Sequence, residues 1–148
     1  MFKKILIANR GEIATRIIIT CREMGLHTIA LYEAPDAGSR HVRIADECVR
    51  LDSPQGFLDQ EAILRIAQET GAEAVHPGYG YLAEEPTFVA ACEAAGIVFV
   101  GPGTAVLQTL RNKIEALAKA RAAGFPVVDY APISFDESDL NALEAAAD

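Results

Sequence analysis

His76-Pro77-Gly78-Tyr79-Gly80-Tyr81-Leu82-Ala83-Glu84, in the middle of the chain, is the stretch that decides the fold. It follows a short apolar run, Ala74-Val75, and precedes a segment with helical spacing, so it predicts a loop at the carboxyl end of a strand. Pro77 fixes one backbone angle, while Gly78 and Gly80 permit conformations that a Cβ would forbid. Such a loop brings main-chain N–H groups and tyrosine rings to the edge where open α/β sheets bind ligands. A plain turn is the alternative, because Gly and Pro also punctuate turns.

Apolar runs and helical spacing alternate on both sides of this loop. Strands are expected at residues 5–8, 27–32, 48–51, 74–75 and 97–100. Helices are expected at 12–24, 59–70, 86–96, 104–110 and 112–124, with Asp59 and Asn112 as N-caps and Glu115 completing a capping box. The polar segment 33–46 is assigned neither helix nor strand. This alternation predicts an α/β fold, a doubly wound parallel sheet with helices on both faces.

The first expected helix has one apolar face. Its inward arc holds Ile13, Ile17, Ile18, Cys21 and Met24. Ile19 falls on the opposite side, where an isoleucine either has no special role or marks a surface that meets a partner.

Composition bounds the class of protein. The chain has 148 residues, of which 51% are hydrophobic, and this predicts one globular domain of ordinary size. No apolar run approaches the ~20 residues that cross a bilayer, and the start is too short for a signal peptide, so we expect a cytoplasmic protein that does not enter the membrane. The net charge of −8 argues against a nucleic-acid partner. Three widely spaced cysteines indicate buried thiols rather than disulfides or zinc ligands.

Two common nucleotide motifs are missing from the sequence. The first strand–turn–helix contains Asn9-Arg10-Gly11-Glu12-Ile13-Ala14, with one of the three glycines that a dinucleotide fingerprint needs. Glu12 places negative charge where a phosphate would meet the helix N-terminus. The chain has no G-x-x-x-x-G-K-[ST] loop either. Nicotinamide and flavin binding are therefore disfavoured.

Several separated motifs, in order, resemble the N-terminal domain of biotin carboxylase, which also opens the corresponding parts of acetyl-CoA, propionyl-CoA and pyruvate carboxylases. The resemblance covers residues 3 to about 128. The motifs are Ile7-Ala8-Asn9-Arg10-Gly11-Glu12-Ile13-Ala14-x-Arg16, Asp36 with His41, Ala45-Asp46-Glu47, His76 to Glu84, and Gly101-Pro102 with Lys113.

The resemblance implies a Rossmann-like domain that precedes an ATP-grasp domain. It implies ATP-dependent carboxylation of biotin by bicarbonate through carboxyphosphate, with Mg²⁺ or Mn²⁺ on the phosphates. Lys113 matches a lysine that reaches nucleotide phosphates, and its place at a helix start would add free N–H groups. Tyr79 and Gly80 match the loop that borders the biotin and bicarbonate pocket, and Glu84 is nearby.

The resemblance also suggests partners. Arg16, Ile19 and Glu23 are expected on the surface of a family-type homodimer. The remaining biotin carboxylase domains, a biotin carboxyl carrier protein and a carboxyltransferase are expected to complete the system.

A metal site was also weighed. Asp36, His41 and Asp46 could form a metal triad, but helix caps and turn hydrogen bonds explain them equally well. We expect no metal ligand and no catalytic residue within these 148 residues, and His76 is expected to be a packed, hydrogen-bonded residue rather than a base.

The chain departs from the family pattern in three places. Leu110-Arg111-Asn112-Lys113 stands where Met-Gly-Asp-Lys is usual, Ala83 and Glu85 stand where serine and asparagine are usual, and Val128-Asp129-Tyr130 replaces Val-Pro-Gly. We expect residues 1–128 to form the N-terminal domain and 129–148 to form a connector and the start of an acidic helix. The family's lid and catalytic residues lie beyond Asp148, so this chain alone is expected to be an inactive fragment.

Two other functions remain open at this point. The chain could be a free-standing α/β module that binds a partner or a small ligand without catalysis. It could also precede another ATP-grasp ligase, such as a carbamoyl-phosphate or purine-pathway enzyme, although the motifs at Asn9 and His76 fit that reading least well.

Overall fold

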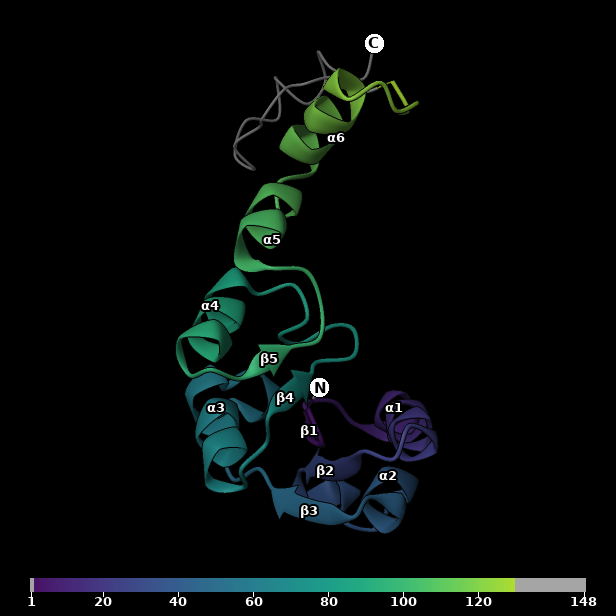
Figure 1. Ribbon diagram of the computed structural model, residues 1–148, viewed down its shortest axis with the longest axis vertical. Helices are drawn as coiled ribbons and strands as arrows, with labels where there is room; N and C mark the ends of the chain where they lie inside the picture. Colours follow the sequence, from purple (N-terminus) through teal and green to yellow (C-terminus); the bar gives the residue numbers. More distant parts are fainter. Residues whose placement is uncertain (1, 130–148) are drawn as a thin grey trace. The chain divides into compact units, whose positions relative to one another are not determined.

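The computed structural model describes residues 2–129 of the chain (Figure 1). In this part, five strands form one parallel sheet in the order β3-β2-β1-β4-β5. The strands are β1 (Lys4–Ile7), β2 (His27–Tyr32), β3 (Glu47–Arg50), β4 (Ala74–His76) and β5 (Val98–Phe99). The predicted doubly wound parallel α/β fold is therefore confirmed.

Six α-helices and two 3-10 turns are found among the described residues. The α-helices are α1 (Gly11–Glu23), α2 (Arg40–Ile44), α3 (Gln60–Glu69), α4 (Pro86–Ala94), α5 (Thr104–Leu110) and α6 (Lys113–Ala122). The turns are η1 (Ala34–Asp36) and η2 (Gly56–Leu58). The chain divides into two compact units, Met1–Gln108 and Thr109–Asp148. The acidic helix expected at 136–148 lies outside the described residues.

The two faces of the sheet bury separate hydrophobic cores, because successive side chains of a strand point to opposite faces. Leu6 and Ala8 pack with residues of α3 and α4, whereas Ile5 and Ile7 pack with residues of α1. Figure 1 shows α1 and α2 beside one another, apart from the pair α3 and α4. Burying each large aliphatic side chain is worth about 1.5–3 kcal/mol, which explains the unbroken apolar run in β1.

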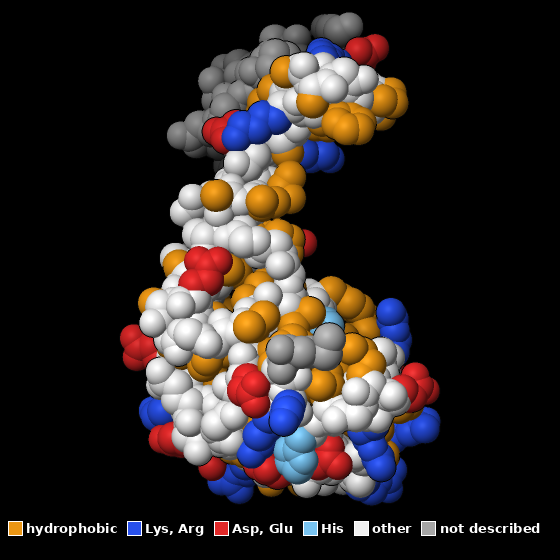
Figure 2. Space-filling model, viewed as in Figure 1, with side chains coloured by type: hydrophobic (Ala, Val, Ile, Leu, Met, Phe, Trp, Pro, Cys, Tyr) orange, Lys and Arg blue, Asp and Glu red, His pale blue; other side chains and the backbone are white. Residues whose placement is uncertain are grey.

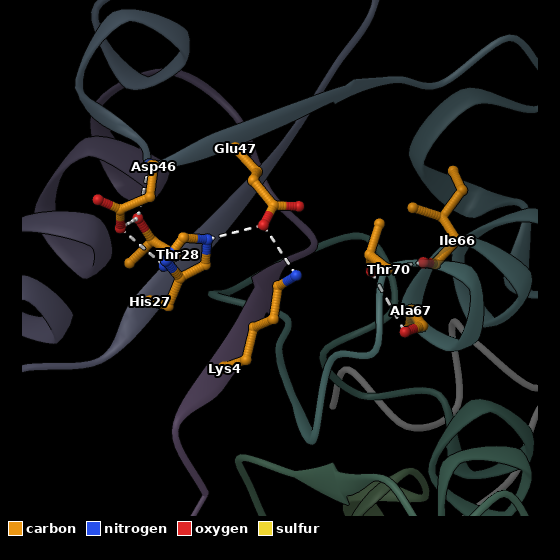
Figure 3. Close-up of polar contacts among 8 residues, drawn as sticks. All are labelled: Lys4, His27, Thr28, Asp46, Glu47, Ile66, Ala67 and Thr70. Carbon is orange, nitrogen blue, oxygen red and sulfur yellow. Dashed lines mark hydrogen bonds and ion pairs between the residues drawn. The ribbon is translucent and has the colours of Figure 1, made fainter.

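Side-chain caps mark the starts of α3, α4 and α6, whereas α1 and α2 begin without one. Asp59 accepts a hydrogen bond from the N–H of Ala62 at 2.9 Å, as expected of the N-cap of α3. At the other end of α3, the Thr70 hydroxyl donates to the carbonyls of Ile66 and Ala67 at 2.6 and 3.2 Å (Figure 3). Asn112 caps α6, as the sequence predicted.

Three details of the predicted elements and burial were wrong. Cys48 is exposed, although all three cysteines were expected to be buried. Segment 33–46 was expected to hold neither helix nor strand, but it contains η1 and α2. A helix of five residues such as α2 is too short to show a periodic apolar pattern in the sequence. Met24 is 62% exposed instead of buried. It lies one residue beyond α1, where the chain turns at Gly25 towards β2, so its place on the helical arc does not hold.

The surface has no single sign of charge. Figure 2 shows positive and negative side chains intermixed over the β2 and β3 end of the sheet, with hydrophobic side chains between them. Among the described residues no helix combines the length and the apolar character that crossing a bilayer requires.

Candidate functional site

The loop after β4 is fixed by the residue that follows β1. The two strands are neighbours, and Ile7 is paired with His76, so both chains leave the sheet at the same edge. The Asn9 amide donates hydrogen bonds to the carbonyl oxygens of Pro77 at 2.7 Å and Tyr79 at 2.9 Å. Its own side-chain oxygen accepts from the N–H of Arg10 at 2.9 Å. Asn9 is 3% exposed, and its buried bond to Pro77 and partly buried bond to Tyr79 set the path of the loop.

Asn9 was not among the site residues predicted from the sequence. It stands within a longer motif, and its role depends on the pairing of β1 with β4. The available signal was a polar residue directly after an apolar run, at the edge where loops gather.

Gly78 and Gly80 both adopt left-handed backbone angles, with φ of +67° and +70°, but for different purposes. A Cβ on Gly78 would lie 2.6 Å from the Asn9 amide nitrogen and 2.8 Å from a methyl carbon of Ile13. Gly78 therefore permits close packing of the loop on β1 and α1. A Cβ on Gly80 would meet nothing within 4 Å, so the backbone there is open to an approaching ligand.

The residues expected to face a ligand lie on the outer side of this loop. Tyr79 is 66% exposed, and Gly80 and Glu84 are exposed as well. Tyr81 differs, because its ring packs against Phe57 with 5.1 Å between ring centroids. Of the two tyrosines, Tyr79 is therefore the more exposed, at 66% against 43% for Tyr81.

A small hollow of about 190 Å³ opens beside the loop. It is lined by Ile13, Arg16, Ile17, His76, Gly78 and Tyr79. The structure thus brings Tyr79 next to Arg16, which the sequence had assigned to a different surface. Gly80 and Glu84 are not part of its lining. Small-molecule sites usually span about 300–1,000 Å³, so this hollow is smaller than a typical ligand pocket.

His76 supports the loop. Its Nδ1 atom accepts a hydrogen bond from the N–H of Gly78 at 3.0 Å. Burial lowers the pKa of His76, because the charged ring would lose its hydration. Because Nδ1 accepts this hydrogen bond, the ring holds the loop backbone, as expected of a packed, hydrogen-bonded residue.

Asp36, His41 and Asp46 do not gather into a metal site. Asp36 pairs with Arg10 at 2.5 Å, and Asp46 accepts from the N–H and hydroxyl of Thr28 at 2.9 and 2.7 Å, which lowers the pKa of Asp46. His41 is fully buried, and burial lowers its pKa. In residues 2–129, no three His, Cys, Asp or Glu side chains are arranged to hold a metal ion.

Lys113 is exposed and is the first residue of α6, in the second unit. The Asn112 side-chain oxygen accepts from the N–H of Ile114 at 3.0 Å and of Glu115 at 3.3 Å. Two N–H groups at this helix start are thus already bonded. The expectation that Lys113 would be accompanied by free N–H groups was wrong for these two, because the cap that starts the helix also occupies them.

Arg16, Ile19 and Glu23 are all exposed on α1. Their spacing of three and four residues places them on one face of the helix. Ile19 is 40% exposed, as its place on the opposite side of the apolar arc predicted.

The sheet order and the glycine loop at its carboxyl edge define an α/β domain of the kind that binds a ligand beside the strand ends. Residues 1–107 match the family model described as "Biotin carboxylase, N-terminal domain". The chain belongs to the biotin carboxylase family and corresponds to its N-terminal domain.

Known relatives agree with this assignment. The chain is 42% identical to the biotin carboxylase of Halalkalibacterium halodurans over 142 residues, which is 94% of this chain and 31% of that protein. It is 44% identical to the 2-oxoglutarate carboxylase small subunit of Hydrogenobacter thermophilus over 130 residues, or 86% of this chain and 28% of that protein. The chain therefore spans roughly 30% of the length of these relatives.

The fold also matches solved structures. The biotin carboxylase domain dimer of the Hydrogenobacter thermophilus 2-oxoglutarate carboxylase, in complex with MgADP, ADP and bicarbonate, has a TM-score of 0.85 and 43% sequence identity. That match covers 89% of this chain and 30% of the solved chain. The biotin carboxylase domain of a single-chain bacterial carboxylase matches with a TM-score of 0.83 and 44% identity, covering 88% of this chain and 31% of the solved chain.

Proposed function

We propose that this chain supplies the N-terminal part of a biotin carboxylase, the ligase that uses ATP and bicarbonate to carboxylate biotin on a carrier protein. In that reaction the terminal phosphoryl group of ATP passes to bicarbonate, giving carboxyphosphate and ADP. The carboxyl group then passes to a ureido nitrogen of biotin, which loses its proton, and inorganic phosphate is released. The observation that carries the proposal is the loop after β4. It combines an open backbone at Gly80 and an exposed ring at Tyr79 with the hydrogen bonds from the Asn9 amide that hold the loop in place.

The proposed task of the loop is to form one wall of the biotin and bicarbonate pocket. Gly80 has no atom within 4 Å of where a Cβ would be, so a flat ring or a small anion can approach its backbone. The Tyr79 ring can pack on the ureido ring of biotin, and its hydroxyl can form a hydrogen bond. Glu84 is exposed on the same loop and lies near this wall in sequence.

Lys113 is proposed to contact the nucleotide phosphates. Its exposed ammonium group would act as a point charge, and Mg²⁺ or Mn²⁺ would be held with the phosphates by segments outside this chain. The Hydrogenobacter domain dimer contains MgADP and bicarbonate, which supports this assignment of ligands.

The exposed face of α1 is proposed to take part in a homodimer. Arg16, Ile19 and Glu23 lie on this face, and a dimer is known for the Hydrogenobacter domain. A biotin carboxyl carrier protein and a carboxyltransferase are proposed as further partners of the complete enzyme.

A chimaeric enzyme tests this proposal. Residues 1–129 of this chain would replace the matching part of the Hydrogenobacter thermophilus 2-oxoglutarate carboxylase small subunit, and ADP release would be measured with and without biotin and bicarbonate. We expect dependent ADP release from the chimaera and none from the 148-residue chain alone. Tyr79→Ala should raise the KM for biotin, whereas Lys113→Ala should raise the KM for ATP.

Two outcomes would overturn the proposal. One is a folded chimaera without biotin-dependent ADP release, and the other is a Tyr79→Ala chimaera with an unchanged KM for biotin. Tyr32→Phe, at the end of β2 and outside the loop, is the matched control and should leave both KM values unchanged.

A non-catalytic binding module remains the second candidate. The observation that favours it is the Asn112 cap, which occupies two N–H groups that a phosphate could otherwise use. Titration of the chimaeric enzyme with MgADP, followed at the amide signals of α6, separates the candidates, because α6 of a module without nucleotide contacts should show no saturable change.

A further inference from the structure

We propose that Tyr81, held by Arg10 and Asp36, is a positioning residue that keeps Tyr79 and Gly80 turned towards their ligand. This inference rests on the proposed function of the loop, although its structural part can be tested without any ligand. The inference is carried by three observations: the backbone angle of Tyr81, the contacts of its ring, and the position of Arg10 beside Asn9.

Tyr81 has an unfavourable backbone conformation. Its φ is +43°, and among the described residues no other non-glycine has a positive φ. L-residues with bulky side chains rarely adopt this region, because their Cβ crowds the backbone. Such a conformation persists only where surrounding contacts hold it in place, and it tends to occur at ligand sites.

The ring of Tyr81 provides one of these contacts. It lies on the ring of Phe57, with centroids 5.1 Å apart and planes inclined by 32°. Phe57 is 2% exposed and belongs to the core beneath α3 and α4. The tyrosine ring is thus anchored on a rigid part of the domain.

Arg10, the N-cap residue of α1, lies beside both Asp36 and Tyr81. The Arg10 guanidinium pairs with Asp36 at 2.5 Å, and Asp36 is 7% exposed. The pKa of Arg10 is raised mainly by Asp36 and to a smaller extent by Tyr81, as expected of a guanidinium close to both side chains. We take this guanidinium, fixed by a buried carboxylate, as the group that holds the tyrosine hydroxyl.

Two consecutive residues, Asn9 and Arg10, contact the loop on either side of Gly80. Asn9 donates to the carbonyl of Tyr79, and the neighbouring Arg10 lies beside the side chain of Tyr81. Gly80 lies between these two points, and its carbonyl accepts from the N–H of Ala83 at 2.9 Å. Releasing Tyr81 should therefore loosen Gly80 without disturbing the sheet.

Amide hydrogen exchange on the 148-residue chain tests this inference. Tyr81→Phe keeps the ring on Phe57 and removes the hydroxyl. We expect exchange at the N–H groups of Gly78 and Ala83 to become roughly three- to ten-fold faster, the factor that corresponds to losing one ordinary hydrogen bond. The N–H of Val98, which bonds to the Glu73 carbonyl at 2.9 Å in the sheet, should be unchanged.

A second variant tests whether the effect passes through Arg10. Asp36→Asn should speed exchange at the N–H of Ala83. In the double variant with Tyr81→Phe, the acceleration should be smaller than the product of the two single accelerations, because both changes act on one guanidinium. Tyr32→Phe removes a tyrosine hydroxyl elsewhere and should change neither loop amide. Unchanged exchange at Gly78 and Ala83, or an equal factor at all three amides, would overturn the positioning role.

The functional arm uses the chimaeric enzyme. Tyr81→Phe should raise the KM for biotin by a similar roughly three- to ten-fold factor with kcat little changed, since the residue orients the wall and does not touch the reacting atoms. Faster loop exchange with an unaltered KM would contradict the positioning of a ligand wall. If the chimaera itself lacks activity, the proposed function fails while the exchange results still decide whether Tyr81 positions the loop.

Discussion

The two ends of the parallel sheet are built in different ways. At the carboxyl end, Asn9, Gly78 and His76 form buried hydrogen bonds and close contacts that leave the backbone of Gly80 open. At the amino end, Lys4 and His27 both contact one carboxylate oxygen of Glu47 at 2.8 Å (Figure 3). The amino end satisfies its charges within the domain, whereas the carboxyl end directs its polar groups to shaping a loop.

The two ends also differ in how strongly their polar contacts stabilise the fold. The side chains of Lys4 and Glu47 are 25% and 42% exposed, so water screens their interaction and it stabilises the fold only weakly. The bond from Asn9 to the Pro77 carbonyl lies in the interior, where an unmatched polar group is costly. The carboxyl end is therefore the more rigidly held of the two, which is the property that the proposed ligand wall requires.

The largest expected effect comes from Gly78→Ala. The alanine would have to adopt a left-handed backbone conformation, and its Cβ would lie 2.6 Å from the Asn9 amide nitrogen. We therefore expect a loss of about 2–4 kcal/mol in the free energy of unfolding. Gly80→Ala is the matched control, because its φ is similar but the space is open, and it should lose only about 1 kcal/mol. Urea unfolding monitored by circular dichroism measures both. Equal losses would show that close packing on Asn9 does not matter.

Asn9→Ala should have the next largest effect. It removes the donor to the carbonyls of Pro77 and Tyr79, and the Pro77 bond lies in the interior, so about 2–3 kcal/mol of stability should be lost. Asn9→Asp keeps the size and the acceptor for Arg10 but loses the donor, and it should be almost as harmful. Denaturant unfolding of both variants is the measurement. If Asn9→Asp were as stable as the unchanged chain, the Asn9 amide would not be the group that holds the loop in place.

Much of this molecule could be predicted from its sequence, but not the difference between these glycines. The apolar runs located all five strands, and Asp59 and Asn112 marked the helix starts, because these signals are local. Gly78 and Gly80 are identical in sequence terms and nearly so in φ. They differ only in what lies across the β1–β4 pairing, and a single sequence does not show such a contact between distant residues.

The same reasoning applies to the helix starts. Asn112 was correctly predicted as a cap, yet the cap itself uses the N–H groups that a phosphate at Lys113 was expected to share. Conversely, α2 was missed because five residues hold too little pattern, although His41 within it is fully buried.

The two ends should also lose stability in different pH ranges. Burial lowers the pKa of His76 and His41 in the folded chain. Below about pH 6.5 the unfolded chain therefore binds more protons than the folded chain, and the free energy of unfolding decreases as the pH is lowered. The pKa of Glu47 is lowered by hydrogen bonds from Lys4 and His27, so its contribution is lost only in more acidic solution, as pH falls below about 4.5. Urea unfolding from pH 8 to 3, with the histidine ring signals followed by NMR, should resolve two steps. A single step in the acidic range would contradict neutral, buried histidines at the carboxyl end.

The smallest effect is expected at the amino end. Glu47→Gln removes the shared partner of Lys4 and His27, but surface ion pairs contribute little, so the loss should be under about 1 kcal/mol and should shrink further in 1 M salt. Glu61→Gln, which makes the same change of charge on α3, controls for net charge. Urea unfolding at low and high salt measures both. A loss above about 2 kcal/mol would mean that this cluster is as necessary to the fold as Asn9 is. If that loss did not change with salt, charge screening would play no part in the contribution of the cluster.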